Sequence, residues 1–318
     1  MSALYSGNQT SAMEFLLLGF HKIKQGKSFF LVFFLTVYTM CFLGNSLILT
    51  VAVLNQSLHT PMYFFLSNLS FLDICYLSVT IPKMVVDILQ VQPPSISFMG
   101  CAAQMYFLIS LQGTEGFLLA SMALDRYIAI CCPLIYSTLM NKWTCLQLAA
   151  VSWTCGFLNA SLHTPLTFRL SFCRSNRINH FFCDIPPLLS ITCSDTSINQ
   201  AVLYTMGIFV GFSPFLFILA SYAFILHAVL SNRQTGQHHK AISTCASHLT
   251  VVVLFYCSGL FTYIRPTSSY SLEKDQLVGV LYNTLAPTLN PLIYSLRNKE
   301  VKMAMRKLIC GRTFSFRI

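Results

Sequence analysis

The chain has 318 residues, of which 55% are hydrophobic and only 9% are charged. Soluble domains carry roughly 25% charged residues, so this chain could not cover a water-exposed surface. The composition excludes an ordinary soluble protein and predicts a polytopic membrane protein. Membrane lipid is therefore an expected partner, and nucleic acid is not.

The N-terminal segment, residues 1–28, is expected outside the cell. It contains Asn8-Gln9-Thr10, a glycosylation acceptor that is usable only on that side. No basic stretch precedes Glu14–Phe20, so we expect no cleaved signal peptide, and the first span would act as its own insertion signal. Other acceptor sequences fall within spans or in a cytoplasmic loop and are discounted: Asn55, Asn68 and Asn159.

Seven apolar stretches are long enough to cross a bilayer, which takes about 20 helical residues. They lack the strict alternation of a membrane β-barrel, and lipid offers no partner to an open backbone hydrogen bond. The prediction is an all-α membrane protein, a seven-transmembrane helix bundle over residues 29–296, without a soluble domain. The expected spans are about 29–54, 61–89, 99–124, 143–165, 199–230, 241–264 and 277–296.

An odd number of spans places the termini on opposite sides. Lys and Arg number 9 on the N-terminal side and 11 on the other, so the positive-inside bias is weak by count. Seven of those 11 lie in the tail after Leu296, which favours a cytoplasmic C-terminus. The long loop of about 166–198 would then lie outside, where disulfides persist, and it holds Cys173, Cys183 and Cys193.

The third span concentrates polar groups on one face. Cys101 and Arg126 are 25 residues apart, so they lie within about 20° of each other on a helix and about 37 Å apart along it. This face must point into the bundle, with a cysteine at one membrane surface and an arginine at the other. Along the same stripe lie Met105, Leu108, Ile109, Gln112 and Glu115.

Asp125-Arg126-Tyr127, at the inner end of the third span, resembles the signature of rhodopsin-like (class A) G-protein-coupled receptors. Further matches fall in the expected spans and order: Gly44-Asn45, Asp73, Trp153, Pro214, Tyr222 and Asn290-Pro291-Leu292-Ile293-Tyr294. The stretches LHTPMYFFLSNLSFLD (58–73), MALDRYIAICCPLIY (122–136), KAISTCASHL (240–249) and PTLNPLIYSLRNKEV (287–301) resemble the olfactory (odorant) receptor family. The resemblance covers residues 11 to 309.

The resemblance implies roles in activation and G-protein coupling. Asp125 would hold the inner end of the third helix, and Arg126 would turn toward the G protein. Plainer alternatives are an interfacial anchor for this pair and interface aromatics for the tyrosines. The residues carried over are Asp125, Arg126, Tyr127, Tyr222, Lys240, His248, Asn290, Pro291 and Tyr294.

Asp73 and Glu115 are the acids deepest in the spans, where an unpaired charge is costly. With Asn45 and Asn290 they resemble the sodium pocket of class A receptors. The two acids could share a sodium ion, one could stay protonated, or the pair could be purely structural. No other metal or cofactor is expected. Asp87 and Lys83, near the outer end of the second span, are expected to be solvated.

Four outer cysteines permit three pairings. The resemblance implies Cys101–Cys183 and Cys173–Cys193. Residues 297–318 form the cytoplasmic end, where a short amphipathic eighth helix over 298–309 would lie on the inner leaflet. Palmitoylation of Cys310 is an open alternative there.

The resemblance places a ligand cavity between the third, fifth, sixth and seventh helices. Its apolar lining with a few hydrogen-bonding groups suits a small neutral volatile molecule. Taken singly, each position could equally be helix packing. The positions carried over are Met105, Leu108, Ile109, Gln112, Met206, Val210, Tyr256, Gly259, Leu260, Tyr263 and Asn283.

Two rival receptor classes lack their residues; residue type does not exclude peptide receptors, although nothing favours them over the odorant-receptor motifs. Leu108 stands where aminergic receptors have an Asp, and Thr284 where opsins have the retinal Lys. A transporter would show paired repeats and a polar pore, and the two acids have no companion motif for an enzyme. The expected function is an odorant receptor that activates a heterotrimeric G protein of the stimulatory, olfactory type and raises cyclic AMP.

Overall fold

The structure is a computed structural model that describes residues 14–20, 26–173, 175–231, 245–257, 259, 272–297 and 301–303. For 272–279, 282 and 295–297 it describes the backbone alone. Several predicted features lie outside these residues: Asn8, Lys240, Leu260, Tyr263 and Cys310. Of the predicted eighth helix, only 301–303 are described, and they are helical.

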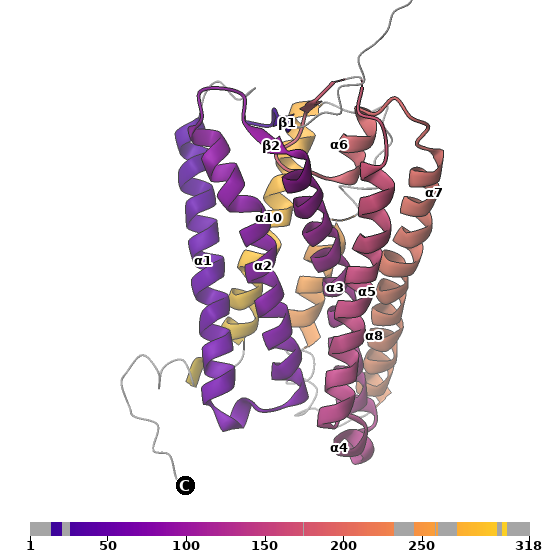
Figure 1. The fold of residues 1–318 in the computed structure, drawn as a ribbon. Coiled ribbons are helices and arrows are strands. Elements are labelled where there is room, and N and C mark those ends of the chain that lie inside the picture. The colour runs from indigo at the N-terminus through magenta and orange to yellow at the C-terminus, as the bar shows by residue number, and fades with distance from the viewer. Residues whose placement is uncertain are drawn as a thin grey trace, which may run out of the picture.

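Long helices run side by side in a bundle (Figure 1). Five segments of the described chain are long and apolar enough to cross a membrane. A shorter apolar helix, Cys245–Cys257, covers the described part of the predicted sixth span, and α10 (Leu272–Arg297) covers the seventh. The five are α1 (Lys27–Leu54), α2 (Pro61–Leu89), α3 (Phe98–Cys131), α5 (Lys142–Phe168) and a composite fifth span, Ser197–Ser231.

Short elements join the spans. The turns η1 (Gln56–Leu58) and η2 (Pro133–Ile135) and the helix α4 (Tyr136–Leu139) lie at one end of the bundle. At the other end lie α6 (Ile185–Ser190) and the strands β1 (Glu14–Leu17), β2 (Ser95–Ser97) and β3 (Arg177–Ile178). We call these the α4 end and the sheet end.

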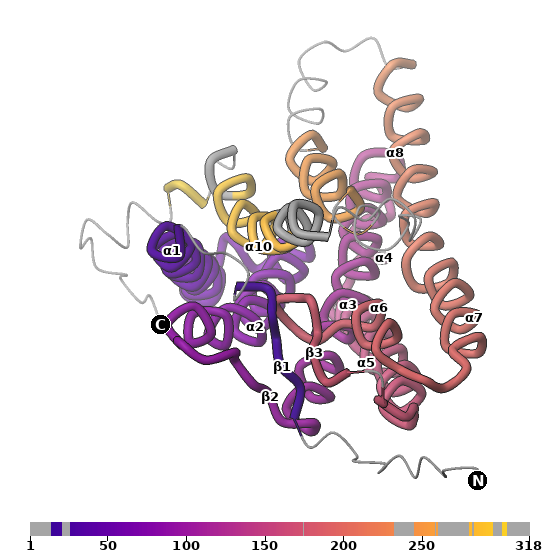
Figure 2. Tube along the Cα trace, turned by 90° about the horizontal axis from the view of Figure 1, so that it is seen from above, coloured from indigo at the N-terminus to yellow at the C-terminus, as the bar shows by residue number. Residues whose placement is uncertain are grey.

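The three strands form one small sheet in the order β2-β1-β3. Strand β1 pairs antiparallel with β2 and parallel with β3, so the N-terminal segment lies between two loops (Figure 2). Phe15 and Leu17 on β1 are fully buried. The ring of Phe15 packs edge-on against Phe172, with centroids 5.1 Å apart. The N-terminal strand is therefore part of the fold.

Two disulfides hold the sheet end. Cys101 at the start of α3 bonds Cys183, and Cys173 bonds Cys193 within the loop between α5 and the fifth span. These are the pairings that the resemblance implies. Each joins Cα atoms less than 7 Å apart, at 5.5 and 5.8 Å respectively, which is within the reach of a disulfide.

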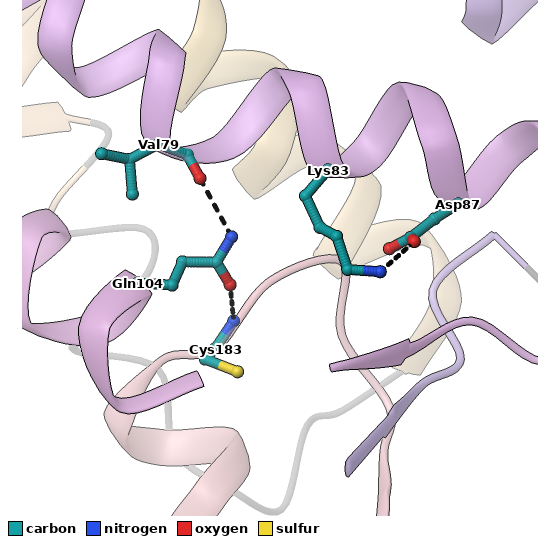
Figure 3. Close-up of polar contacts among 5 residues, drawn as sticks. All are labelled: Val79, Lys83, Asp87, Gln104 and Cys183. Atoms are coloured by element: carbon teal, nitrogen blue, oxygen red, sulfur yellow. Dashed lines mark hydrogen bonds and ion pairs between the residues drawn. The ribbon is translucent and has the colours of Figure 1, made fainter. Parts of the chain in front are cut away.

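Gln104 on α3 adds a polar link beside the first disulfide (Figure 3). Its amide donates to the Val79 carbonyl of α2 at 3.1 Å and accepts from the Cys183 N–H at 2.9 Å. Lys83 forms an ion pair with Asp87 one turn along α2. Asp87 is only 3% exposed, so the expectation that it is solvated was wrong. The neighbouring lysine lets this acid lie against the protein.

α3 occupies the centre of the bundle. In an 18-residue apolar stretch of this helix, 78% of the residues are buried. Its closest approach to α5 is through glycines: a Cβ on Gly113 would lie 3.2 Å from the Gly156 Cα. Small residues let membrane helices pack backbone to backbone. Ser97 caps α3 by accepting a hydrogen bond from the Gly100 N–H at 3.1 Å.

Proline shapes α10. Pro291 has no N–H to give to the Pro287 carbonyl one turn earlier. The Asn45 side chain of α1 donates to that carbonyl instead, at 3.3 Å. Gly44 sits beside the Pro291 ring, because a Cβ there would lie 3.1 Å from it. Gly44-Asn45 therefore fits α1 against the irregular backbone of α10.

The fifth span is not one regular helix. α7 (Ser197–Met206) and α8 (Ser213–Ser231) are separated by a π-helical segment, η3 (Gly207–Phe212). Pro214 follows it and cannot donate to the Val210 carbonyl, which favours such a widened turn. In an 18-residue apolar stretch of this span, only 28% of the residues are buried. The π-helical segment is thus both irregular and loosely covered.

Candidate functional site

A cavity of about 500 Å³ lies between α3, α5, the fifth span and the helix Cys245–Cys257. Ile185 of α6 also reaches it. No Lys, Arg, Asp or Glu is among its described lining residues. Most of the lining is apolar, and the polar members are Gln112, Asn159, His163, Tyr204 and Tyr256. A volume and lining of this kind suit a small organic molecule without a net charge.

The fifth span forms a thin wall of this cavity. A Cβ on Gly207 or Gly211 would meet nothing within 4 Å. On the same wall, Tyr204 and Ile208 are 67% and 60% exposed. The wall therefore faces the outside of the bundle as well as the cavity.

α5 supplies the opposite wall with two buried polar side chains, Asn159 and His163. They are four residues apart, so they lie one above the other on one helical face. The Asn159 Oδ1 atom is buried without a hydrogen-bond partner, and so is the Tyr256 hydroxyl. Two residues of the cavity lining thus carry polar atoms whose hydrogen bonds the protein does not satisfy.

A cluster of polar oxygens lies next to the cavity, toward the α4 end. The Asn290 amide donates to both carboxylate oxygens of Asp73, at 3.2 and 3.0 Å. Glu115 is close enough to Asp73 for their charges to repel. On α3, Glu115 is followed by Gly116, where a Cβ would lie 3.6 Å from the Tyr256 hydroxyl. The acid pair and the cavity therefore share a stretch of α3.

The oxygens of this cluster fit a hard cation, which prefers carboxylate and amide oxygens. Three of them are buried without a hydrogen-bond partner: Asn45 Oδ1, Glu115 Oε1 and Asn290 Oδ1. Within the described chain, no group of three His, Cys, Asp or Glu residues could hold a metal. The groups that could bind a cation here are therefore two carboxylates and two side-chain amides.

At the α4 end, Asp125 and Arg126 have separate partners. Tyr136 donates to the Asp125 carboxylate at 2.8 Å. Burial and the Asp125 charge raise the pKa of Tyr136, so the donor keeps its proton. Arg126 is 8% exposed and donates to the Met62 sulfur at 3.2 Å. Among the residues described, these neighbours do not form an ion pair with each other, since the one ion pair found is Lys83–Asp87.

Three further residues of the predicted activation motif, Tyr222, His248 and Tyr294, lie within electrostatic range of Arg126. The Tyr222 hydroxyl of α8 shares a 2.8 Å hydrogen bond with His248 Nδ1. The Tyr294 hydroxyl of α10 is buried without a partner. Tyr127 packs near Phe224, with ring centroids 6.0 Å apart. The Tyr222–His248 bond joins the fifth span to the helix Cys245–Cys257.

A sequence profile described as "Olfactory receptor" matches residues 34–312. The chain belongs to the olfactory receptor family. Mouse "Olfactory receptor 5AP2" is 50% identical over 302 residues, which cover 95% of each chain. The human protein of the same name is 48% identical over 309 residues, covering 97% of this chain and 98% of the relative. Human "Olfactory receptor 12D1" is 48% identical over 301 residues, or 94% of each chain.

Family membership makes this olfactory receptor a G-protein-coupled receptor and not an enzyme. Together with its apolar helices, it identifies a multi-pass protein of the plasma membrane. The sequence resemblance to the family is therefore confirmed.

The structure groups the predicted ligand positions of this olfactory receptor only in part. Those that line the cavity are Ile109, Gln112, Met206, Val210, Tyr256 and Gly259. Met105, Leu108 and Asn283 do not line it. The first two are buried against other side chains in the packed core.

The α5 wall of the receptor was not predicted. Asn159 was considered only as a glycosylation acceptor, and His163 was not considered. A usable signal was present, because polar side chains one turn apart inside an apolar span are functional candidates. The contact of α6 with the cavity was not predicted either, because the sequence of the long loop of about 166–198 gave no indication of it.

Proposed function

We propose that this olfactory receptor binds a small, mostly apolar volatile molecule in the cavity and activates a stimulatory G protein, raising cyclic AMP. The observation that carries the proposal is that one helix joins the two functional regions. Tyr256 on Cys245–Cys257 lines the cavity, and His248, eight residues earlier, binds Tyr222 beside Arg126. Eight helical residues span about 12 Å. A movement of this helix at the cavity is therefore transmitted toward Arg126.

The activation mechanism is a shift between two states. A ligand against α3 and Tyr256 favours the state in which the helix of His248 moves outward at the α4 end. Breaking the Tyr222–His248 bond frees Tyr222 to turn toward Arg126, with Tyr294 as a further partner. Arg126, Asp125 and Tyr127 then meet the G protein, and GDP is released. The ligand drives this change only through its different affinity for the two states.

The proposal includes the full topology. Seven helices cross the membrane, with residues 1–28 and the sheet end outside and residues 297–318, including a short eighth helix, in the cytoplasm. Asn8 carries a glycan. Asp73 and Glu115, with Asn45 and Asn290, hold either a sodium ion or a shared proton. Lys240 and Pro291 belong to the moving inner ends of their helices. Leu260 and Tyr263 continue the ligand site.

The test is a cyclic AMP assay on cells that express the receptor with a stimulatory G protein, against a panel of volatile compounds. A response to a volatile should disappear in Arg126→Ala at equal surface expression. Arg169→Ala is the matched control, because Arg169 is exposed near the sheet end of α5, and its response should equal the wild type. A full response in Arg126→Ala would contradict the role of Arg126. A response through another G protein would contradict the stimulatory assignment.

A further inference from the structure

Two polar groups of the cavity have unsatisfied hydrogen bonds. Asn159, on α5, is 9% exposed, and its Oδ1 atom has no partner. The Tyr256 hydroxyl, on the helix Cys245–Cys257, is buried without one as well. A buried polar group left unpaired is costly, so such groups are rare in folded proteins. Both line the same cavity, which makes them candidates for bonds to a bound molecule.

Both groups approach one short stretch of α3. The Asn159 Nδ2 atom lies 3.9 Å from the Cβ position of Gly113, and the Tyr256 hydroxyl lies 3.6 Å from that of Gly116. Residues three apart on a helix are neighbours on its surface, about 5–6 Å from each other. One small molecule lying along this stretch of α3 can therefore contact both groups.

We propose that this cavity selects small neutral alcohols and phenols over the corresponding carbonyl compounds and hydrocarbons, with Asn159 and Tyr256 as the specificity-determining residues. The proposal rests on the function proposed above, and names its ligand class. A hydroxyl group donates one hydrogen bond and accepts others, so it can donate to Asn159 Oδ1 and accept from the Tyr256 O–H. The apolar remainder of the cavity holds the carbon skeleton.

Other ligand classes satisfy this pair less well. An aldehyde, ketone or ester oxygen only accepts, so it can bond Tyr256 but leaves Asn159 Oδ1 unpaired. A hydrocarbon leaves both unpaired. A ligand that leaves such groups unpaired therefore binds less tightly than one that pairs them. A charged ligand would find no opposite fixed charge among the described lining residues.

The experiment measures binding directly, without a G protein. The probes are matched triplets on one carbon skeleton: octan-1-ol, octanal and octane, and 2-phenylethanol, phenylacetaldehyde and ethylbenzene. The measurement is the rise in unfolding temperature of the purified full-length receptor in detergent against probe concentration. In at least one triplet, the alcohol should stabilise at a concentration about tenfold to a hundredfold lower than the aldehyde. The hydrocarbon should be weaker still.

Two variants test the residues. Tyr256→Phe removes only the hydroxyl, and Asn159→Leu removes the amide at similar size. Each should reduce the preference for the alcohol to less than about threefold. Tyr38→Phe is the matched control, since it also removes one tyrosine hydroxyl but lies between α1 and α2, away from the cavity lining; it should keep the wild-type preference. Without ligand, both test variants should unfold no earlier than the wild type, because each loses an unpaired buried group.

The outcomes separate this proposal from the function on which it rests. An alcohol preference that is lost in both variants supports it. Equal binding of aldehyde and alcohol, a preference that survives in both variants, or no stabilisation by either alcohol overturns it. In those three cases, a cyclic AMP response to some volatile that needs Arg126 would leave the proposed function standing. Alcohol-selective binding without any such response would support the ligand class and contradict the signalling.

Discussion

α3 and the fifth span both line the cavity, but the protein holds them very differently. Within an 18-residue apolar stretch of each, 78% of the residues of α3 are buried, whereas only 28% are buried in Ser197–Ser231. α3 is capped by Ser97, bonded through Gln104 to α2 and to the loop, and tied by a disulfide at Cys101. The fifth span has a π-helical segment with two glycines at which an added Cβ would meet nothing within 4 Å.

This difference separates a fixed wall from an adjustable one. Close packing makes α3 a rigid reference, since packed interiors yield little to small changes. The open space beside Gly207 and Gly211 leaves room for the fifth span to shift against a ligand. The Tyr222–His248 bond links the same span to the helix Cys245–Cys257. A ligand can therefore move the fifth span and that helix while α3 stays in place.

The largest expected effect is that of Gly156→Ala. The new Cβ would lie 2.3 Å from the Ser110 carbonyl oxygen and 2.8 Å from the Thr114 nitrogen, both backbone atoms of α3. Neither can move without separating α3 from α5, so we expect a loss of about 3 kcal/mol or more. The measurement is surface expression together with the unfolding temperature in detergent.

Gly211→Ala is the matched control on the fifth span, where the added Cβ meets nothing within 4 Å. It should express like the wild type. Equal tolerance of both substitutions would break the contrast between the two walls.

The next effect comes from the disulfides. Cys101–Cys183 closes 82 residues and Cys173–Cys193 closes 20. Loop-closure entropy predicts losses of about 4.5 and about 3.3 kcal/mol when each pair is replaced by serines. Replacing the Cys101–Cys183 pair should therefore lower the unfolding temperature more than replacing the Cys173–Cys193 pair. The reverse order would show that the loop before the fifth span, and not α3, limits stability.

A smaller effect is the loss of folding stability at acidic pH. Burial beside Phe181 and Phe182 lowers the pKa of His180 from 6.5 to about 4. Between these values the unfolded chain binds a proton that the folded one does not, so stability is lost as the pH falls from about 6.5 to about 4. From pH 7.5 to 5 this amounts to about 2 kcal/mol.

The unfolding temperature of the wild type should fall over that pH range more than that of His180→Asn. An identical fall in both would mean that the loop over α3 does not carry the acid sensitivity.

The smallest effect is that of Tyr222→Phe, which removes the 2.8 Å bond to His248. A hydrogen bond of this kind contributes about 1 kcal/mol. The variant should lose little stability, but its ligand-free cyclic AMP level should change, because the bond holds one signalling state. Tyr38→Phe, which removes the Tyr38–Ser78 bond between α1 and α2, should leave that level unchanged.

The sequence by itself determined the membrane class, the approximate spans and the family. Helix formation in lipid depends on local composition, because every span must bury its own backbone bonds and present apolar side chains. The expected 61–89 coincides with α2, and 29–54 differs from α1 by two residues at one end. The motifs around Asp73, Arg126 and Asn290 identified the family, because each is a contiguous run of residues.

Only the tertiary structure decided which side chains share the cavity. Asn159 and Tyr256 are 97 positions apart in the sequence, yet both line the cavity. The pairing of β1 between two loops also depends on partners distant in sequence. The π-helical segment was not foreseen from Pro214, since a proline in a span is also compatible with a simple kink. The composition of a helix specifies that it spans the membrane, but its neighbours specify which face binds a ligand.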